Sequence, residues 1–393
     1  MAKSEGGSDG PVVIVGGGIG GLASALSLAR VGQEVLVLEK APEFAEIGAG
    51  LQLAPNATRV LESLGLLEKI KSLGVLPNKL VIRAALTDTP LTYLEIGEDF
   101  LRRYETPYVV MHRNDLLSTI LQACQEEPSI ELCSGKEIIE VDNTDGGIVA
   151  TCSDGSSYRG KALIGADGLW STVRKKLVDD SPICSGYVAY RGAVPIEMAT
   201  VHAPLDEVVA WIGPGMHYVQ YPLRSGKLYN QVAVFRSDQY LEGKEDWGNP
   251  EELDLKLSAA CDHIKAASKL LGKDHRWPMY DRDPIDRWTE GNITLLGDAA
   301  HPMLQYLAQG ACQAIEDAYV IGEVFKAPHD SVHEALVKYE NIRRPHASRI
   351  QTTARTWGDI WHIDGLGMML RDELFRQRDP DDHTHIEWIY GKH

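Results

Sequence analysis

Three glycines near the N-terminus have the spacing that phosphate binding requires. Gly16, Gly18 and Gly21 follow the pattern G-x-G-x-x-G in the stretch GGGIGG. In this pattern the backbone amides approach a pyrophosphate closely, which a Cβ atom would block, and the following helix presents its partial positive charge to the phosphates. Glu39 lies about twenty residues further on, where a carboxylate can accept hydrogen bonds from a ribose diol. The pattern predicts dinucleotide binding and does not separate FAD from NAD.

The residues around these glycines predict the elements that hold them. The apolar run 12–15 is typical of a buried parallel strand, residues 22–31 predict a helix that ends at Gly32, and 35–38 is a second strand. Strand, glycine turn, helix and strand form a βαβ unit. Glu39 then ends the second strand, where it disfavours a 2′-phosphate because two anions repel. A solvated charge at a strand end is the alternative interpretation of Glu39.

Two aspartates follow short apolar strands later in the chain. Asp167-Gly168 comes after the strand 162–164, and Gly297-Asp298 comes after the strand 293–296. A carboxylate at the C-terminal end of a strand in an α/β sheet points into the ligand crevice. Asp298 is therefore a candidate acceptor for ligand hydroxyls, with a helix N-cap as the alternative. Asp167 serves equally well as a purely structural hydrogen-bond acceptor.

The segments 162–174 (ALIGADGLWSTVR) and 297–302 (GDAAHP), together with the glycine pattern before them, resemble motifs of the single-component flavin-dependent aromatic hydroxylases. The resemblance spans nearly the whole chain and implies bound FAD, with NADH as a transient electron donor. It implies that Asp298 binds the ribityl chain, that Arg113 contacts the flavin side chain, and that Asp167 and Gly168 assist FAD and nicotinamide binding. The cofactor-binding residues expected from it are Gly16, Gly18, Gly21, Glu39, Lys40, Arg113, Asp298, Gly310 and Ala311.

Three further segments resemble the subgroup of this family that hydroxylates 3-hydroxybenzoate: 215–222 (GMHYVQYP), 303–310 (MLQYLAQG) and 361–365 (WHIDG). The wider family usually has proline at the position of Gln305 and glycine at that of Ala308. These departures from the general pattern fit the subgroup.

His217 and Tyr221 lie four residues apart on a predicted strand, so both side chains point to one face. On that face, a neutral histidine can accept or share the proton of a phenol, which enriches the ortho and para carbons in electrons. Gln305 is the second catalytic candidate, and Tyr221 and Tyr108 are candidates for binding the substrate. Without the resemblance, a buried core histidine is the simpler interpretation of His217, and we assign no catalytic role to His301.

The resemblance implies that NADH reduces FAD, that reduced flavin and O2 form a C4a-hydroperoxide, and that oxygen is transferred para to the substrate hydroxyl. The product from 3-hydroxybenzoate is 2,5-dihydroxybenzoate (gentisate). Hydroxylation with decarboxylation, as with salicylate or 6-hydroxynicotinate, is an alternative. A flavin reductase that does not oxygenate, a flavin halogenase and a non-enzymatic binding protein are alternatives from other classes. The chain lacks the tryptophan-rich lysine motif expected of a halogenase.

Composition limits the range of partners. The chain has 393 residues and a formal charge of −17, without the clustered cations that nucleic-acid binding needs. Residues 11–29 carry no charged side chain, but their glycines and serines favour a buried strand and helix over a membrane span. Six scattered cysteines and the lack of a metal-ligand motif favour a reduced, cytoplasmic, metal-free protein. Small molecules, namely an aromatic acid and O2, are the expected partners.

The expected fold class is α/β: a FAD-binding Rossmann-like domain with an inserted sheet-rich substrate domain and a helical C-terminal region. Residues 1–10 are expected to be a disordered tail. We assign 11–180 and 286–393 to the FAD-binding domain and 181–285 to the mainly β substrate domain, whose strands are predicted at 187–195, 207–212, 216–222 and 230–235. One helix is predicted over 55–73 and another over 116–124. Helical sequence runs from 311 nearly to the end, and its part from about 331 could pack a homodimer, with core packing as the alternative interpretation.

Overall fold

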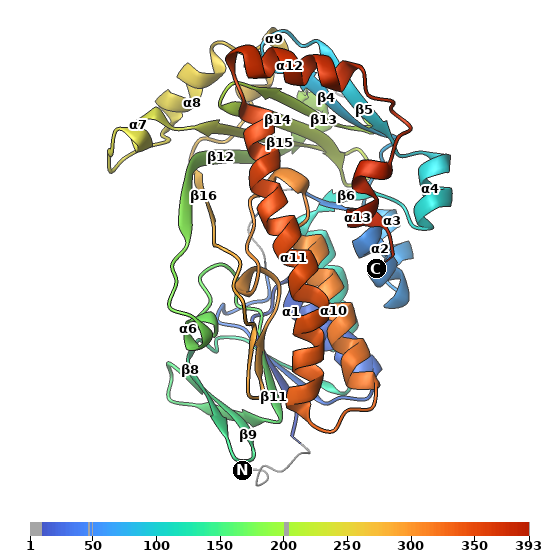
Figure 1. Cartoon of the computed structure of the whole chain (residues 1–393), viewed down its shortest axis with the longest axis vertical. Coiled ribbons are helices and arrows are strands. Elements are labelled where there is room, and N and C mark those ends of the chain that lie inside the picture. Colours follow the sequence, from blue (N-terminus) through green and yellow to red (C-terminus); the bar gives the residue numbers. More distant parts are fainter. Residues whose placement is uncertain (1–9, 46–47, 49, 200–203, 393) are drawn as a thin grey trace.

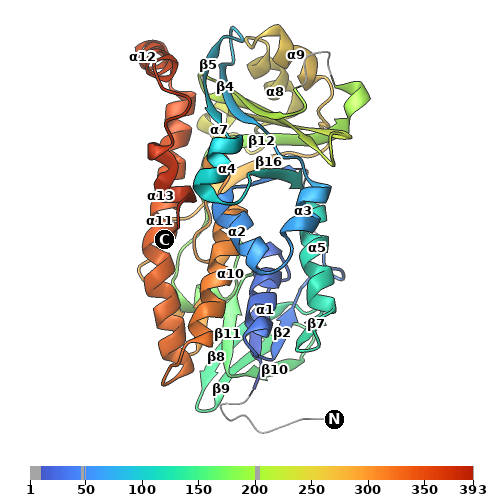
Figure 2. The same cartoon turned by 90° about the vertical axis from the view of Figure 1, so that its right-hand side faces the viewer.

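The computed structural model describes residues 10–45, 48, 50–199 and 204–392. The molecule is elongated, with one sheet at each end of its long axis (Figures 1 and 2). Of the predicted tail, residues 1–9 lie outside the described residues.

The first of the two large sheets has six strands. Its strand order is β17-β18-β11-β1-β2-β7, and all neighbours are parallel except β17 and β18. The strands are β1 (Val12–Val15), β2 (Val35–Leu38), β7 (Ile130–Cys133), β11 (Ala162–Gly165), β17 (Thr289–Glu290) and β18 (Ile293–Leu295). β1, β2, β11 and β18 are buried along their whole length, as parallel strands covered on both faces require.

The second large sheet has seven strands, in the order β16-β12-β15-β14-β13-β4-β5. Its strands are β4 (Lys79–Ala84), β5 (Pro90–Glu95), β12 (Ile183–Pro195), β13 (Glu207–Gly213), β14 (Met216–Leu223), β15 (Leu228–Arg236) and β16 (Trp277–Asp281). The assignment of residues 79–95 to the first domain is therefore corrected. Their strands extend the second sheet because β4 pairs in parallel with β13, a long-range pairing that no local pattern reveals.

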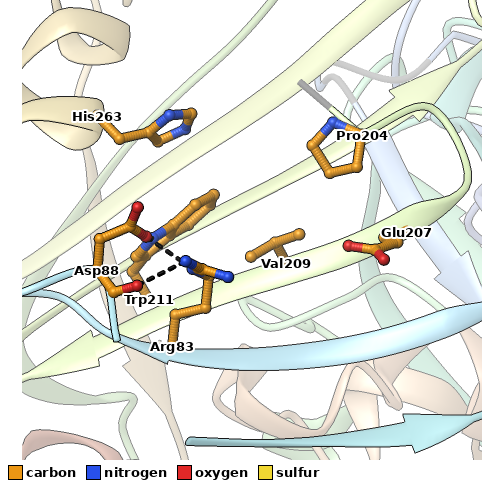
Figure 3. Close-up of a pocket in the computed structure, with 7 residues that line it drawn as sticks. All are labelled: Arg83, Asp88, Pro204, Glu207, Val209, Trp211 and His263. Carbon is orange, nitrogen blue, oxygen red and sulfur yellow. Dashed lines mark hydrogen bonds and ion pairs between the residues drawn. The ribbon is translucent and has the colours of Figure 1, made fainter. Parts of the chain in front are cut away.

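The two faces of the second sheet have different neighbours. The outer face packs against α8 (Pro250–Leu257) and α9 (Asp262–Ser268). In the sequence these two helices follow the short helix α7 (Asp238–Leu241). An open hollow of about 640 Å³ also lies on this face (Figure 3). In it, Asp88 accepts hydrogen bonds from Arg83 and from the indole of Trp211, on which His263 stacks. The inner face looks toward the first sheet.

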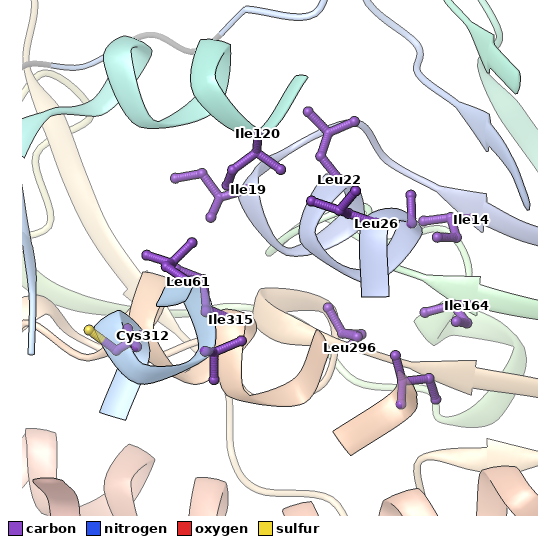
Figure 4. Packing of buried hydrophobic residues seen from close by; sticks show 14 of the residues in the cluster. Ile14, Ile19, Leu22, Leu26, Leu61, Ile120, Ile164, Leu296, Cys312 and Ile315 are labelled. Carbon is purple, nitrogen blue, oxygen red and sulfur yellow. The ribbon is translucent and has the colours of Figure 1, made fainter. Parts of the chain in front are cut away.

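Helices pack around the first sheet and close its core. α1 (Ile19–Arg30) contacts α5 (Arg113–Gln125) and α10 (Gly310–Lys326), and α10 in turn contacts α2 (Pro55–Ser63). Figure 4 shows the resulting layer, with Leu22 and Leu26 of α1 next to the strand residue Ile14. The single helix predicted over 55–73 is in fact two, α2 and α3 (Leu67–Leu73), because Gly65 between them adopts a left-handed conformation with φ of 71°.

The C-terminal helices join the two sheets. α11 (Val332–His362) runs along the molecule from the first sheet to the second (Figure 1). Beyond it, α12 (Gly365–Arg376) packs against β5, and α13 (Glu387–Tyr390) packs against α2. The C-terminal region therefore belongs to both halves of the fold, since α11 brings residues of its last turns beneath the inner face of the second sheet.

The remaining strands form smaller sheets. β3 (Gly50–Leu53) pairs with β6 (Val109–His112), while β8 (Ile138–Thr144), β9 (Gly147–Cys152) and β10 (Ser157–Gly160) form an antiparallel group. The short helices α4 (Glu98–Tyr104) and α6 (Arg174–Leu177) lie outside the sheets. No helix within the described ranges is both long and apolar enough to cross a membrane. All six cysteines are free thiols.

Candidate active site

A cavity of about 910 Å³ lies between the two sheets and collects residues from distant parts of the chain. Most of the residues that the sequence singled out line it. These are Gly18, Tyr108, Arg113, Gly168, His217, Tyr221, Asp298, Gln305, Gly310 and Ala311. Five others do not line it: Gly16, Gly21, Glu39, Lys40 and Asp167.

The three glycines have different structural duties. Gly16 adopts a φ of 109°, and a Cβ there would lie 2.3 Å from the carbonyl oxygen of Ala166. A Cβ on Gly21 would lie 2.0 Å from the carbonyl oxygen of Gly16. At Gly16 and Gly21, backbone packing already excludes a side chain, while Gly18 faces the cavity. The close approach of all three glycines to a pyrophosphate stays a prediction.

Glu39 ends β2, as the sequence predicts, and its carboxylate organises the turn that follows β1. Its Oε2 accepts a hydrogen bond of 2.6 Å from the amide of Gly17, and its Oε1 accepts one of 2.8 Å from the amide of Ala41. These contacts tie the ends of β1 and β2 together. Lys40 beside it is exposed.

Asp167 is a structural acceptor in this fold. Its carboxylate accepts hydrogen bonds from the hydroxyl of Ser171 at 2.6 Å and from the amide of Thr172 at 2.7 Å. The turn that it holds leads to Arg174, whose buried guanidinium donates to the carbonyls of Ala299 and Ala300 at 2.9 Å. The loop after β11 is thus joined directly to the loop after β18.

Asp298 lies in that second loop, and a buried ionic cluster fixes the turn before it. Asp317 of α10 accepts hydrogen bonds from the amide of Gly297 at 2.9 Å and from Arg343 at 2.7 Å, and its carboxylate lies 2.6 Å from Nε2 of His301. These contacts give His301 a structural role. The carboxylate of Asp298 itself caps no helix and is exposed to the cavity.

Charges of both signs border this part of the cavity. Enclosure by the surrounding protein raises the pKa of Asp298, against the opposing effect of His301 and Arg113. Burial lowers the pKa of Arg113, the first residue of α5. The guanidinium stays protonated because its ordinary pKa is so high. The cavity therefore offers an acceptor carboxylate and a fixed cation near one another.

His217 lies on the inner face of β14, with its ring enclosed by aromatic side chains. Its Nδ1 is 2.8 Å from Nε2 of His362, the last residue of α11. The rings of Tyr306 and Trp361 meet it edge to face, at centroid distances of 5.5 Å and 5.2 Å. Burial lowers the pKa of His217 well below 6.5 and the pKa of His362 to about 3, so both rings are neutral at pH 7.

Gln305 lies next to a cation that the sequence analysis did not identify. Its Oε1 accepts a hydrogen bond of 2.6 Å from Arg191 of β12, and both side chains line the cavity. A signal for Arg191 did exist. Arg191 is a basic residue two positions after Ala189 in the predicted strand 187–195, so both side chains point to the same face of the strand. Ala189 lies in a buried hydrophobic cluster, and a charged side chain on the same face is unusual.

The two tyrosines differ in their available hydrogen-bonding groups. The hydroxyl of Tyr108 donates to Oε1 of Gln52 at 2.6 Å, so in this arrangement it offers a ligand only its oxygen as an acceptor. The hydroxyl of Tyr221 makes no hydrogen bond to any residue that the structure describes. Its ring packs on Gly50, where a Cβ would lie 2.6 Å from the tyrosine ring.

The residues around the cavity fit FAD. The N-termini of α1 and α10 both border it, at Gly18 and Gly310, and no side chain caps either helix. Uncapped amides and the cation of Arg113 suit the negatively charged pyrophosphate, and the carboxylate of Asp298 suits a chain of hydroxyls. The far end of the cavity, at Gln305 and His217, is closed by aromatic residues that suit a flat ring.

Comparison with known proteins agrees with this geometry. The profile of a family described as "FAD binding domain" matches residues 9–354. The chain is also 37% identical over 389 residues to the 3-hydroxybenzoate 6-hydroxylase of Polaromonas naphthalenivorans (strain CJ2), an alignment that covers 99% of this chain and 97% of the relative. The chain belongs to the family of FAD-binding monooxygenases.

Two further comparisons place this flavoprotein monooxygenase within its family. It is 34% identical to the 3-amino-4-hydroxybenzoate 2-monooxygenase of Streptomyces cremeus, over 97% of this chain and 95% of the relative. Its fold superimposes with a TM-score of 0.83 on a variant of HpxO from Klebsiella pneumoniae, solved in complex with FAD, at 24% identity and with coverage of 94% and 95% of the two chains. The predicted fold class is confirmed.

Proposed function

We propose that this monooxygenase hydroxylates 3-hydroxybenzoate para to its hydroxyl group, consuming NADH and O2 and releasing gentisate and water. The observation that carries the choice of substrate is the full-length similarity to an enzyme named for this reaction. The cavity supports the proposal because it combines a neutral histidine, an amide and a cation with apolar walls, a combination that suits a hydroxylated aromatic acid.

FAD is held, in this proposal, by Gly18, Arg113, Asp298 and the start of α10. When bound, it supplies the electrons taken from NADH and the centre at which O2 is activated. Glu39 and Asp167 act on the shape of the site, through the turns that they hold, and Gly16 and Gly21 act through close packing. The protein's own task is then to bind the aromatic acid, orient it and manage its proton.

His217 accepts or shares the proton of the substrate hydroxyl. In one tautomer of the histidine pair, Nδ1 of His217 donates to Nε2 of His362, which leaves Nε2 of His217 as the acceptor for the phenol proton. Because the pKa of His217 is low, a strong hydrogen bond from the phenol is favoured over complete proton transfer until the substrate's negative charge raises that pKa. Either interaction increases the electron density at the carbon para to the hydroxyl.

Gln305 and the aromatic walls orient the ring and exclude water. Arg191 occupies Oε1 of Gln305, so the amide nitrogen is the group that remains to donate to the substrate. Tyr306, Trp357 and Trp361 line the same part of the cavity. A dry site favours oxygen transfer to the ring over the loss of oxidising equivalents as hydrogen peroxide.

The test is a panel of aromatic acids. The purified holoenzyme receives 3-hydroxybenzoate, salicylate or 6-hydroxynicotinate, and NADH oxidation, oxygen uptake, CO2 release and products are measured, with NADPH as a parallel donor. We expect gentisate from 3-hydroxybenzoate, one NADH consumed per product and no CO2. A decarboxylated product from either of the other acids, with no gentisate from the first, would overturn the proposal.

A further inference from the structure

Arg191 is a largely enclosed cation for which the described residues supply no anionic partner. Its guanidinium lies 5.9 Å from the ring centroid of Trp277, and its one hydrogen bond to the described residues goes to the neutral amide of Gln305. Its Nε is buried without any hydrogen-bond acceptor. The side chain lines the cavity.

The deeply buried arginines of this protein are paired. Arg174 and Arg282 both contact Asp180, Arg343 contacts Asp317, and Arg371 contacts Asp372, each at 2.7 Å or less. Removing a cation from water is costly unless an anion and hydrogen bonds compensate. Burial lowers the pKa of Arg191, and nearby Arg113 lowers it further, but an arginine does not lose its proton in a protein. A ligand in the cavity can supply the missing anion.

The sheet leaves room in front of this cation. Arg191 of β12 pairs in register with Val232 of β15, which pairs with Val219 of β14, and these valines form part of the cavity floor. His217 belongs to the neighbouring row of the same face, two strands away from β12, which is about 10 Å at the backbone. A flat ring over the valines therefore has a cation at one side and the histidine at the other.

We propose that Arg191 binds the carboxylate of the aromatic substrate and makes the enzyme select aromatic acids over neutral phenols. The planar guanidinium can present two of its N–H groups as a fork to a carboxylate while it continues to hold Gln305. This inference rests on the proposed function, because it assigns the acid group of that substrate class to one residue. It extends the function by naming what sets the selectivity.

The experiment measures ligand dissociation constants, from the change in flavin absorbance of the holoenzyme, for benzoate, 3-hydroxybenzoate and 3-hydroxybenzamide. In the Arg191→Met variant we expect both acids to bind roughly 10- to 100-fold more weakly, the size of a lost charge-assisted hydrogen bond, and the amide to change less than about threefold. Benzoate has no hydroxyl, so its loss reports on the carboxylate alone. The result is independent of whether gentisate is formed.

Two further variants make the outcome decisive. Arg191→Lys keeps the positive charge but loses the paired N–H donors of the guanidinium, so the acids should bind with an affinity between those of the parent enzyme and Arg191→Met. If Arg191→Met does not fold, the comparison of acids and amide is made with Arg191→Lys instead. Arg83→Met is the matched control, because Arg83 pairs with Asp88 in the hollow on the opposite face of the same sheet (Figure 3), and it should leave all three constants unchanged.

Equal weakening of the acids and the amide would overturn the proposal, because it would mean that Arg191 only positions Gln305. Unchanged binding of benzoate would overturn it as well. If benzoate binding depends on Arg191 and yet 3-hydroxybenzoate is not converted to gentisate, the carboxylate site stands and the proposed substrate fails.

Discussion

His217 shows how burial gives a single residue its chemical character. On an exposed loop this side chain would titrate near pH 6.5, but enclosure by Tyr306, Trp361 and His362 keeps it uncharged at neutral pH. A neutral ring accepts a phenol proton, whereas a protonated ring cannot. The environment, more than the residue type, therefore makes His217 the candidate acid–base group.

Replacing His217 with asparagine should lower the rate of hydroxylation about 100-fold while FAD remains bound, because the phenol loses its proton acceptor. NADH oxidation should continue and release hydrogen peroxide, which a peroxidase assay measures beside product formation. His263→Asn is the control, since His263 stacks on Trp211 on the other face of the sheet. Full coupled turnover by the His217 variant at pH 7 would remove this residue from the mechanism.

His362 is expected to act through His217 as a positioning residue. In His362→Leu, the acceptor for Nδ1–H of His217 is lost, the tautomer changes, and hydroxylation should fall about tenfold or more. His362→Gln keeps a side-chain acceptor and should restore much of the coupling between NADH oxidation and product. If the two variants have equal coupling and equal melting temperatures, His362 does not set the tautomer.

At the scale of elements, the loops after β11 and β18 are fastened to each other by one buried arginine. Arg174 donates to the carbonyls of Ala299 and Ala300 and pairs with Asp180, and Asp298 lies immediately before these carbonyls. The strands alone do not fix the loops, because a parallel sheet ends where the loops begin. The position of Asp298, the acceptor that we propose for the ribityl chain, therefore depends on contacts between loops.

Arg174→Met should destabilise the fold by about 3 kcal/mol, because it leaves the buried carbonyls of Ala299 and Ala300 without their donor and Asp180 with Arg282 as its remaining arginine partner. FAD should dissociate more easily, which flavin fluorescence detects. Lys176→Met, which removes the exposed ion pair with Asp142, should cost less than about 1 kcal/mol and leave FAD bound. Equal unfolding free energies for the two variants would contradict this account.

At the scale of the whole molecule, the site exists only because α11 joins the two sheets. This helix carries Trp357, Trp361 and His362 to the inner face of the second sheet while its other end packs against the first. Gly358 permits the contact, since a Cβ there would lie 2.4 Å from the ring of Tyr306. Titration of the buried histidine pair therefore affects the stability of the assembled fold.

Stability should fall as the pH is lowered from 7 to 5.5. Burial is the main cause that lowers the pKa of both His217 and His362. The neighbouring His362 and Arg191 lower the pKa of His217 further, and Arg371 and Arg236 lower that of His362. Below about pH 6.5 the unfolded chain therefore binds protons that the folded chain does not bind. Each histidine contributes a slope of at most about 1.4 kcal/mol per pH unit. The double variant His217→Asn/His362→Gln should show a shallower slope in denaturant titrations, whereas the exposed His329→Gln should not.

The sequence by itself determined the nucleotide half of this protein. The glycine turn, the aspartates after β11 and β18, and the strands that hold them are local patterns, because each motif and its supporting strand are close in sequence. Because successive side chains of a strand point to opposite faces, the even spacing of His217 and Tyr221 on β14 also predicted that they share a face. Local patterns did not predict that β4 and β5 join the second sheet, since strand partners distant in sequence are chosen by packing.

The tertiary structure decided the remainder of the site. Only the folded chain places Arg191 against Gln305 and His362 against His217, residues more than a hundred positions apart. It also separates residues that the sequence treated alike, so that Gly18 faces the cavity while Gly16 and Gly21 pack against backbone. Burial and the absence of a charged partner are properties of the surroundings, and the surroundings of these residues come from elements that meet only in three dimensions.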